Sequence, residues 1–380
     1  MRRTRGIAVA AIALTSALSL VGCAKDSNTG SGANNQSGSN NAQACATAEK
    51  PAAAPAQSTS AGSGEKVDGS ALKVGLAYDI GGRGDASFND AAAKGLDEAK
   101  AALGITQVKE LTAGANESEA DKQTRLRQLA AEGHNPIIGV GFAYSEATKA
   151  VAPEFPNTKF AVVDGFVEGV PNVTGLLFAE EQGSFLVGVA AAYKSKSCKI
   201  GFVGGVNIPL IQKFEAGFTQ GVKAVAPNAT VEKTYLTEAG DFTGFQDAPK
   251  GQIATKGLID KGVDVVYQAA GASGKGVFAA AQEGNVLAIG VDSDQYNQPT
   301  VAEYKDVIIT SMLKRVDVAV LNYITAVAKG DTSSLPPVFD LSVDGVGYAT
   351  SGGKIDDITD VLDAYKAQIV DGKIEVKDTP

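Results

Sequence analysis

Short apolar runs alternate with segments of helical periodicity from Leu72 onward. The apolar runs carry hydrophobic residues at consecutive positions, as expected for parallel strands covered on both faces. Strands are predicted at Leu72–Tyr78, Pro136–Val140, Lys159–Val163, Lys199–Val203, Val263–Gln268, Val286–Val291 and Val307–Ser311. Helices are predicted at Asp90–Leu103, Ser118–Glu132, Ser145–Ala152, Gln182–Lys194, Leu210–Val225, Lys250–Asp260, Gly276–Gln282 and Arg315–Lys329. Strands followed by helices in this way predict βαβ units and an α/β fold.

The series restarts near residues 173–178, which predicts two doubly wound parallel-sheet lobes joined by a hinge. We expect an N-terminal lobe of residues 71–178 plus 293–332 and a C-terminal lobe of residues 179–292 plus 333–376. Because ligands of open α/β sheets bind beyond the carboxyl ends of the strands, the functional residues should directly follow strands.

Residues 1–22 have the pattern of a secretory leader. Arginines at positions 2, 3 and 5 precede an Ala/Leu-rich stretch that is too short and too weakly apolar for a comfortable membrane span. The closing string Leu20-Val21-Gly22-Cys23 resembles a bacterial lipobox, in which Cys23 is lipidated and becomes the mature N-terminus. An ordinary leader with an incidental cysteine is the alternative. The lipobox interpretation places the chain outside the cytoplasmic membrane and disfavours nucleotide-cofactor and DNA-directed functions.

Residues 23–70 are predicted to be a flexible tether. They are Ser, Gly, Asn, Ala, Gln and Pro with almost no large apolar side chain, so folded material should begin at Leu72. Cys45 lies in this tether, and Cys198 directly precedes a predicted strand. A Cys45–Cys198 disulfide is not expected, since a flexible partner gives no geometric reason for it. The cysteine spacing also argues against a zinc site.

Charge and histidine content exclude further classes of function. The formal net charge of −9 becomes about −12 once the three leader arginines are removed, which disfavours nucleic acid as a partner. His134 is the single histidine and lies in a helix-to-strand turn, where a solvent-exposed loop histidine is expected. A Ser-His-Asp or Cys-His catalytic site would require it, so we do not expect an enzyme.

Candidate binding residues follow the predicted strands of the first half. The segment from Asp79 to Asp90, DIGGRGDASFND, is glycine-rich, which permits close approach by a ligand, and it contains Phe88. Its spacing is not that of a nucleotide-binding glycine fingerprint. Ser87 or Asn89 can cap the following helix. Asp164 ends a later strand, where its carboxylate can accept hydrogen bonds from a ligand or merely cap a turn.

Three further strand ends in the second half carry candidates. The segment after Tyr267 contains Gly271 but lacks Walker A spacing. Asp292 and Asp294 form a D-x-D pair that can hold a hard cation or grip a sugar diol. Lys314 stands at the start of a further predicted helix.

Several strings together carry a family resemblance: GGRGDASFND, FAVVDGFVEGVPNVTGLLFAEEQGSFLVGVAA, KIGFVGGVNIPLIQKFEAGFTQGV, AIGVDSDQY and SMLKRVDVAV. With the leader, they resemble the basic membrane protein family of lipoproteins, in order from about Leu72 to beyond Tyr348. The resemblance implies a type I periplasmic-binding-protein-like fold. It also implies a solute-binding component of an ABC importer, and many members bind purine nucleosides.

The resemblance also implies roles for individual residues. The first loop would supply Asp79, a stacking Phe88 and Asn89, and Asp164 would contact the base. Asp292 and Lys314 would hold the ribose hydroxyls. For the second stacking ring we expect Tyr267, with Phe242 as the competitor. At Gly271 the resemblance implies backbone contacts, and the chain departs from the family pattern directly after it, because Ala272 stands where the family often has a second glycine.

The predicted function is therefore a lipid-anchored receptor that closes on a purine nucleoside (guanosine, inosine or adenosine) and delivers it to an ABC permease. We expect a monomer with neither metal nor cofactor. Carboxylates suit hydroxyl and N–H donors and repel phosphates, which favours nucleosides over nucleotides. The alternatives are a receptor for another ring-bearing solute (a sugar, flavin or signalling molecule), a sensor lipoprotein, and an extracytoplasmic nucleoside hydrolase.

Overall fold

A computed structural model of the 380-residue chain describes residues 45–49, 51, 67–114 and 117–380. The predicted leader, the lipidation residue Cys23 and most of the predicted tether lie outside these residues. Within the described part of the chain, no helix is both long and apolar enough to cross a membrane.

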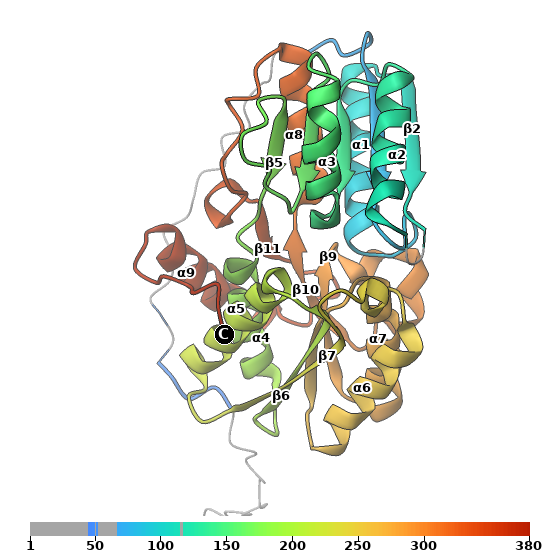
Figure 1. The fold of residues 1–380 in the computed structure, drawn as a ribbon. Helices are drawn as coiled ribbons and strands as arrows, with labels where there is room; N and C mark the ends of the chain where they lie inside the picture. Colours follow the sequence, from blue (N-terminus) through green and yellow to red (C-terminus); the bar gives the residue numbers. More distant parts are fainter. Residues whose placement is uncertain (1–44, 50, 52–66, 115–116) are drawn as a thin grey trace, which may run out of the picture. The chain divides into compact units, whose positions relative to one another are not determined.

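The first sheet contains five parallel strands in the order β2-β1-β3-β4-β5. They are β1 (Lys73–Tyr78), β2 (Gln107–Thr112), β3 (Ile137–Val140), β4 (Phe160–Val163) and β5 (Val173–Leu176). Its helices are α1 (Phe88–Leu103), α2 (Glu119–Ala131), α3 (Ser145–Val151) and α8 (Val316–Lys329). Leu76 packs in one cluster with α1 and α8, whereas the adjacent Ala77 packs with α2 and α3, so helices cover both faces. Figure 1 shows these helices around the sheet.

The second sheet contains six strands in the order β11-β10-β9-β8-β6-β7. They are β6 (Lys199–Asn207), β7 (Thr230–Glu238), β8 (Val265–Ala269), β9 (Leu287–Asp292), β10 (Ile308–Lys314) and β11 (Val346–Tyr348). All pairs are parallel except β10–β11. Its helices are α4 (Glu180–Lys194), α5 (Pro209–Val225), α6 (Ala248–Asp260), α7 (Gly274–Gly284) and α9 (Thr359–Val370). Tyr267 faces the α4 and α5 side and Val266 the α6 and α7 side.

The chain passes between the two lobes at three places: after β5, after β10, and between α8 and β11. Two of these passages run side by side, because Phe178 and Phe339 form a parallel β-bridge and stack their rings 5.3 Å apart. Residues 293–332, which were expected to lie wholly in the N-terminal lobe, are divided between the two lobes. Strand β10 of this segment belongs to the second sheet, and its helix α8 packs against α1 in the first lobe.

All seven predicted strands are present, and the eight predicted helices are found with small shifts at their ends. The second strand and the seventh, β2 and β7, were not predicted. Both are edge strands, and their charged sequences (QVKELT and TVEKTYLTE) lack a continuous apolar run. Strand β5, which lies where the series was expected to restart, was not among the predicted strands, and strand β11 and helix α9 were also missed.

The expectation that folded material begins at Leu72 is wrong. Cys45 is buried and forms a disulfide with Cys198, with Cα atoms 5.2 Å apart. The backbone N–H groups of Thr47 and Ala48 both donate to the carbonyl of Val225 at the end of α5. This short segment is thus fixed to the second lobe, which supplies the geometry that the tether's composition did not reveal.

His134 does lie in the turn between α2 and β3, but the prediction that it is solvent-exposed is also wrong. Its side chain is only 7% exposed, and Nε2 lies 3.7 Å from a Glu132 carboxylate oxygen. Burial lowers the pKa of His134, so the neutral imidazole is favoured. It lies at the amino end of β3, away from the strand ends where candidate residues gather.

Candidate binding site between the lobes

A cavity lies where the carboxyl ends of the strands of both sheets meet. The first lobe lines it with Asp79, Ile80, Asp85, Phe88, Asn89, Gly141, Phe142 and Asp164. The second lobe contributes Leu210, Ile211, Phe214, Phe245, Ala269, Gly271, Val291, Asp292 and Lys314. Of the eight predicted ligand-binding residues, all but Tyr267 line this cavity.

The loop between β1 and α1 is organised by Asp85, a residue that the sequence interpretation missed. Its carboxylate accepts hydrogen bonds from the backbone N–H groups of Ser87, Asn89 and Asp90 at 2.9, 2.9 and 3.1 Å. Asp85 therefore satisfies the free N–H groups at the start of α1, the task expected of Ser87 or Asn89. This arrangement fixes Phe88 and Asn89 at the first turn of the helix.

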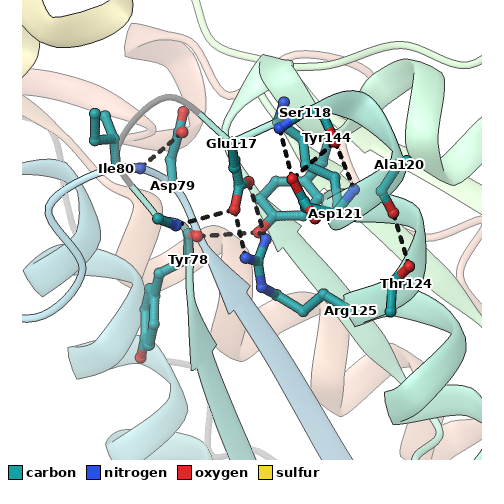
Figure 2. A network of polar contacts seen from close by, with 12 residues as sticks. Tyr78, Asp79, Ile80, Glu117, Ser118, Ala120, Asp121, Thr124, Arg125 and Tyr144 are labelled. Atoms are coloured by element: carbon teal, nitrogen blue, oxygen red, sulfur yellow. Dashed lines mark hydrogen bonds and ion pairs between the residues drawn. The ribbon is translucent and has the colours of Figure 1, made fainter.

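Asp79 directly follows β1, and a polar network supports the end of that strand (Figure 2). Arg125 of α2 donates to Glu117 at 3.0 Å and to the Tyr144 hydroxyl at 2.7 Å. Tyr144 in turn donates to the carbonyl of Tyr78 at 3.1 Å. Gly141 has φ of 112°, and a Cβ there would lie 2.6 Å from Asp79 Oδ2, so only glycine allows this close packing.

Lys314, the last residue of β10, is the centre of a buried ionic cluster. Its Nζ lies 2.6 Å from Asp164 Oδ2 and 2.9 Å from Glu180 Oε1, and the three side chains are at most 4% exposed. The same Nζ is 5.3, 5.1 and 5.5 Å from the ring centres of Phe88, Phe178 and Phe214. Burial alone lowers the pKa of Lys314, but the charges of the surrounding carboxylates outweigh burial and raise it.

Asp292 ends β9 and joins the lobes by accepting a hydrogen bond from the Ser87 hydroxyl. Nearby contacts tie the same loops together. Ser293 Oγ donates to the carbonyl of Ser87 at 3.0 Å, and Gln295 Nε2 donates to the carbonyl of Ala86 at 3.0 Å. The β1–α1 loop of the first lobe is thus held against the end of β9 in the second.

Two acceptor atoms that face this region have no hydrogen-bond partner among the described residues: Asp164 Oδ1 and Asn89 Oδ1. Burial raises the pKa of Asp164 to about 7 against the opposing charge of Lys314, and it raises the pKa of Asp79 and of Asp85 to about 6. Buried acceptors without partners are costly, so a ligand that donates N–H or O–H groups would be stabilised here.

The aromatic residues of the cavity differ from those expected. Tyr267 lies two residues before Ala269, the strand-end residue of β8 that lines the cavity, and is fully buried among Phe202 and Phe218, with its hydroxyl 3.1 Å from Ser184 Oγ. It therefore has no free ring face for a ligand. Phe242 does not line the cavity either, but its ring contacts Phe142, which does.

The cavity rings are Phe88, Phe142, Phe214 and Phe245. Phe245 ends the short 3-10 helix η3 (Phe242–Phe245), and a Cβ on Gly205 would lie 2.5 Å from its ring. The missed Phe245 was therefore only three residues from the Phe242 considered from sequence.

The D-x-D pair does not form a cation site. Asp294 Oδ2 accepts hydrogen bonds from Asn297 and Ser351, whereas Asp292 turns toward Ser87 and Lys314. Across the described ranges no group of three or more His, Cys, Asp or Glu side chains is placed to hold a metal ion.

Two lobes of parallel sheet that enclose a polar and aromatic cavity define a type I solute receptor. A solute-binding protein of an ABC transporter system from Aeropyrum pernix superposes with a TM-score of 0.68 at 28% identity, covering 80% of this chain and 92% of that one. A second, from Conexibacter woesei, gives a TM-score of 0.63 at 26% identity over 81% of this chain and 99% of the other.

Sequence comparison defines the family more closely. Residues 71–379 match the family model described as Bmp, ABC transporter substrate-binding protein PnrA-like, and the chain belongs to this family. The chain is 36% identical to a CD4+ T-cell-stimulating antigen of Listeria innocua, over 84% of this chain and 91% of that protein. It is 30% identical to the ABC transporter nucleoside-binding protein BmpA of Lactococcus lactis, over 98% and 99%. An uncharacterized lipoprotein of Pyrococcus furiosus is 33% identical over 80% of each chain.

Proposed function

We propose that this substrate-binding protein captures a purine nucleoside between its lobes and presents it to an ABC permease. One observation carries the proposal: Phe88 at the start of α1 and the strand-end residues Asp164, Asp292 and Lys314 line a single cavity. The Lactococcus lactis relative is named a nucleoside-binding protein, which supports the same ligand class.

In the proposed complex the purine stacks on Phe88, and its N–H groups donate to Asp164 Oδ1 and Asn89 Oδ1. The ribose hydroxyls pair with Asp292 and Lys314. An aromatic stack contributes about 1–3 kcal/mol. A hydrogen bond to a charged group contributes about 1.5–3 kcal/mol. One stack and two such bonds together contribute about 4–9 kcal/mol, and the upper end of that range corresponds to micromolar affinity, about −8.2 kcal/mol.

For the second ring we propose Phe245 in place of Tyr267 and Phe242. Phe245 lines the cavity from the second lobe, and Gly205 leaves room for its ring. Phe88 belongs to the first lobe. A base held between these two rings would therefore join the lobes, so that ligand binding favours the closed form.

The charges favour a nucleoside over a nucleotide. Asp79, Asp85, Asp164 and Asp292 line the cavity, and Lys314, the one cation in that lining, is already paired with Asp164 and Glu180. A phosphate would meet several carboxyl groups without an unpaired cation in the cavity wall to neutralise it.

Isothermal titration calorimetry with guanosine, inosine and adenosine tests this assignment. We expect micromolar or tighter binding of at least one of them, and much weaker binding of its 5′-monophosphate. No heat with any purine nucleoside would remove the nucleoside assignment. Binding of a sugar or flavin in the same assay would favour a receptor for another ring-bearing solute.

We also propose that Cys23 carries the lipid that holds the receptor at the outer face of the membrane. The Cys45–Cys198 disulfide suits an oxidising, extracytoplasmic location. The naming of the Pyrococcus furiosus relative as a lipoprotein points the same way. Cys23→Ser should release the full-length chain from the membrane fraction on cell lysis. Retention of the variant in that fraction would contradict the lipid anchor.

A further inference from the structure

Lys314 has two carboxylate partners, and they come from different lobes. Glu180 is the first residue of α4, which packs against the second sheet, and Lys314 ends strand β10 of that same sheet. Asp164 follows β4 of the first sheet. The Lys314–Glu180 pair therefore lies within one lobe, whereas the Lys314–Asp164 pair crosses between lobes.

Glu180 is buried, and two lysines hold its carboxylate in place. Its side chain is 1% exposed, Oε1 lies 2.9 Å from Lys314 Nζ, and Oε2 lies 3.5 Å from Lys213 Nζ on α5. Glu180 does not line the cavity, so it has no direct route to a ligand there. Its contacts within the second lobe do not depend on how the two lobes are placed.

Lys314 needs such a partner. The three rings of Phe88, Phe178 and Phe214 surround its ammonium group, and its side chain is 2% exposed. Separation of the lobes removes Asp164 and the Phe88 ring from it, and leaves Glu180 in direct contact and the charge of Asp292, at the end of the adjacent strand β9, nearby. A lysine left in an apolar environment without a counter-ion loses its proton more readily, because desolvation disfavours the charged form. A neutral lysine amine would then face the second-lobe half of the cavity.

We propose that Glu180 is a positioning residue that keeps Lys314 charged and directed at the cavity in every lobe arrangement, while Asp164 pairs with Lys314 only on closure. Because this role presupposes the proposed nucleoside site, the decisive measurement does not use a ligand. The pair Glu180–Lys314 would act as the permanent part of the site, and Asp164 as the part that moves.

The test follows the ammonium of Lys314 directly. In protein with 13C-labelled lysine, the Cε signal of Lys314, assigned with Lys314→Arg, is followed from about pH 7 up to the highest pH at which each protein stays folded, and the midpoint is fitted with the neutral-amine shift taken from unfolded protein. We expect Glu180→Gln to lower the fitted midpoint of Lys314 by at least one pH unit, and by more than Asp164→Asn does. Glu181→Gln is the matched control, since Glu181 is the next residue on α4 and makes no contact with Lys314 in the ion pairs above.

A Lys314 midpoint unchanged in Glu180→Gln, or lowered equally by Glu181→Gln, would overturn the inference, and so would a larger shift in Asp164→Asn. If Glu180→Gln does not fold, Glu180→Asp serves instead, because it keeps the charge but withdraws it by one methylene. The midpoint should then fall by a smaller amount, and no change would count against the role of Glu180.

Guanosine affinity supplies the second readout. We expect Glu180→Gln to weaken binding at least tenfold, with the loss increasing as the pH rises, and Glu181→Gln to stay within twofold of the wild type. Equal affinity of Glu180→Gln and wild type across this pH range would contradict the role. If wild type itself binds no nucleoside, the proposed function fails, and the lysine titration still decides the role of Glu180.

Discussion

Asp164 and Asp292 occupy matching positions in the two lobes. Each stands at the carboxyl end of a strand, β4 or β9, and each has a left-handed backbone, with φ of 62° and 61°. Both carboxylates line the same cavity. The left-handed turn directs the chain away from the sheet at the point where the side chain faces the cavity, so conformation and ligand contact are linked at both positions.

This geometry predicts different outcomes for asparagine and alanine. Asparagine tolerates the left-handed conformation, whereas in alanine the same conformation costs about 1 kcal/mol of folding free energy. We expect Asp292→Asn to keep the thermal stability within that margin and Asp292→Ala to unfold at a lower temperature. Both should weaken guanosine binding by about 1.5–3 kcal/mol, the value of a charge-assisted hydrogen bond.

Calorimetry for affinity and circular dichroism melts for stability separate the two effects. Asp344 also has a left-handed backbone, with φ of 53°, but it is exposed and lies outside the cavity. Asp344→Ala is therefore the matched control for the left-handed conformation outside the cavity, and it also removes an ion pair with Lys366, in which Asp344 is exposed. Full nucleoside affinity in Asp292→Asn would show that this carboxylate does not hold the ligand.

Phe88 should contribute a large part of the free energy of nucleoside binding. Phe88→Ala removes the proposed stacking surface and should weaken nucleoside binding by about 1–3 kcal/mol. Tyr267→Phe is the matched control, because it removes only the hydroxyl that lies 3.1 Å from Ser184, and its ring is packed away from the cavity. We expect it to lower stability by about 1 kcal/mol and leave affinity unchanged. Wild-type affinity in Phe88→Ala would mean that Phe88 is only a packing residue.

The central strands were predictable because they are buried on both faces and read as continuous apolar runs. Edge strands β2 and β7 were not predicted, since their exposure allows charged pairs, Lys109-Glu110 and Glu232-Lys233, to interrupt the apolar run. The division of residues 293–332 also escaped prediction. A strand has the same pattern in either sheet, and only pairing with β9 places β10 in the second lobe.

Most of the candidate site was predictable for a geometric reason: the carboxyl ends of parallel strands meet at one edge of a sheet. The rings were harder to predict, because Tyr267 lies on the same face of β8 as the cavity residue Ala269 but two residues deeper in the strand, where it packs against Phe218 of α5. Glu180 resembled an ordinary acidic residue in the first turn of a helix. Its contact with Lys314 joins residues far apart in sequence, and no local pattern marks it.

Stability should depend on pH through Asp79. Burial raises the pKa of Asp79 from 3.8 to about 6, so the folded chain holds this proton where the unfolded chain has lost it. Asp79 therefore lowers the free energy of unfolding increasingly as the pH rises from about 4 through about 6. Above about pH 6 this loss of stability stays constant. Lowering the pH from about 7.5 to about 5 relieves about 1 kcal/mol of it.

Urea denaturation of wild type and Asp79→Asn at both pH values measures this effect. Other ionisable groups contribute equally to both proteins, so the difference between the two free energies of unfolding isolates Asp79. We expect the free energy of unfolding of wild type to increase by about 1 kcal/mol relative to that of Asp79→Asn as the pH is lowered. A difference that does not vary with pH would show that Asp79 is ionised normally in the fold.

The Cys45–Cys198 disulfide closes a loop with a sequence separation of 153 residues. In the chain-entropy description, a cross-link over so long a loop stabilises the fold by up to about 5 kcal/mol, and measured values for natural disulfides are commonly about 2–5 kcal/mol. Cys198→Ser should therefore shift the urea midpoint of the second lobe downward. Cys45→Ser should have the same effect, and the double variant should show no additional loss.

Reduction provides an independent control for this prediction. Wild type treated with a reducing agent should unfold at the same urea concentration as Cys198→Ser, while the variant itself should not respond to the reagent. Because Thr47 and Ala48 also bond to Val225, some protection of the segment from proteolysis should survive in the variants. Equal midpoints for oxidised wild type and Cys198→Ser would show that the cross-link adds no stability and serves only to fix the N-terminal segment to the second lobe.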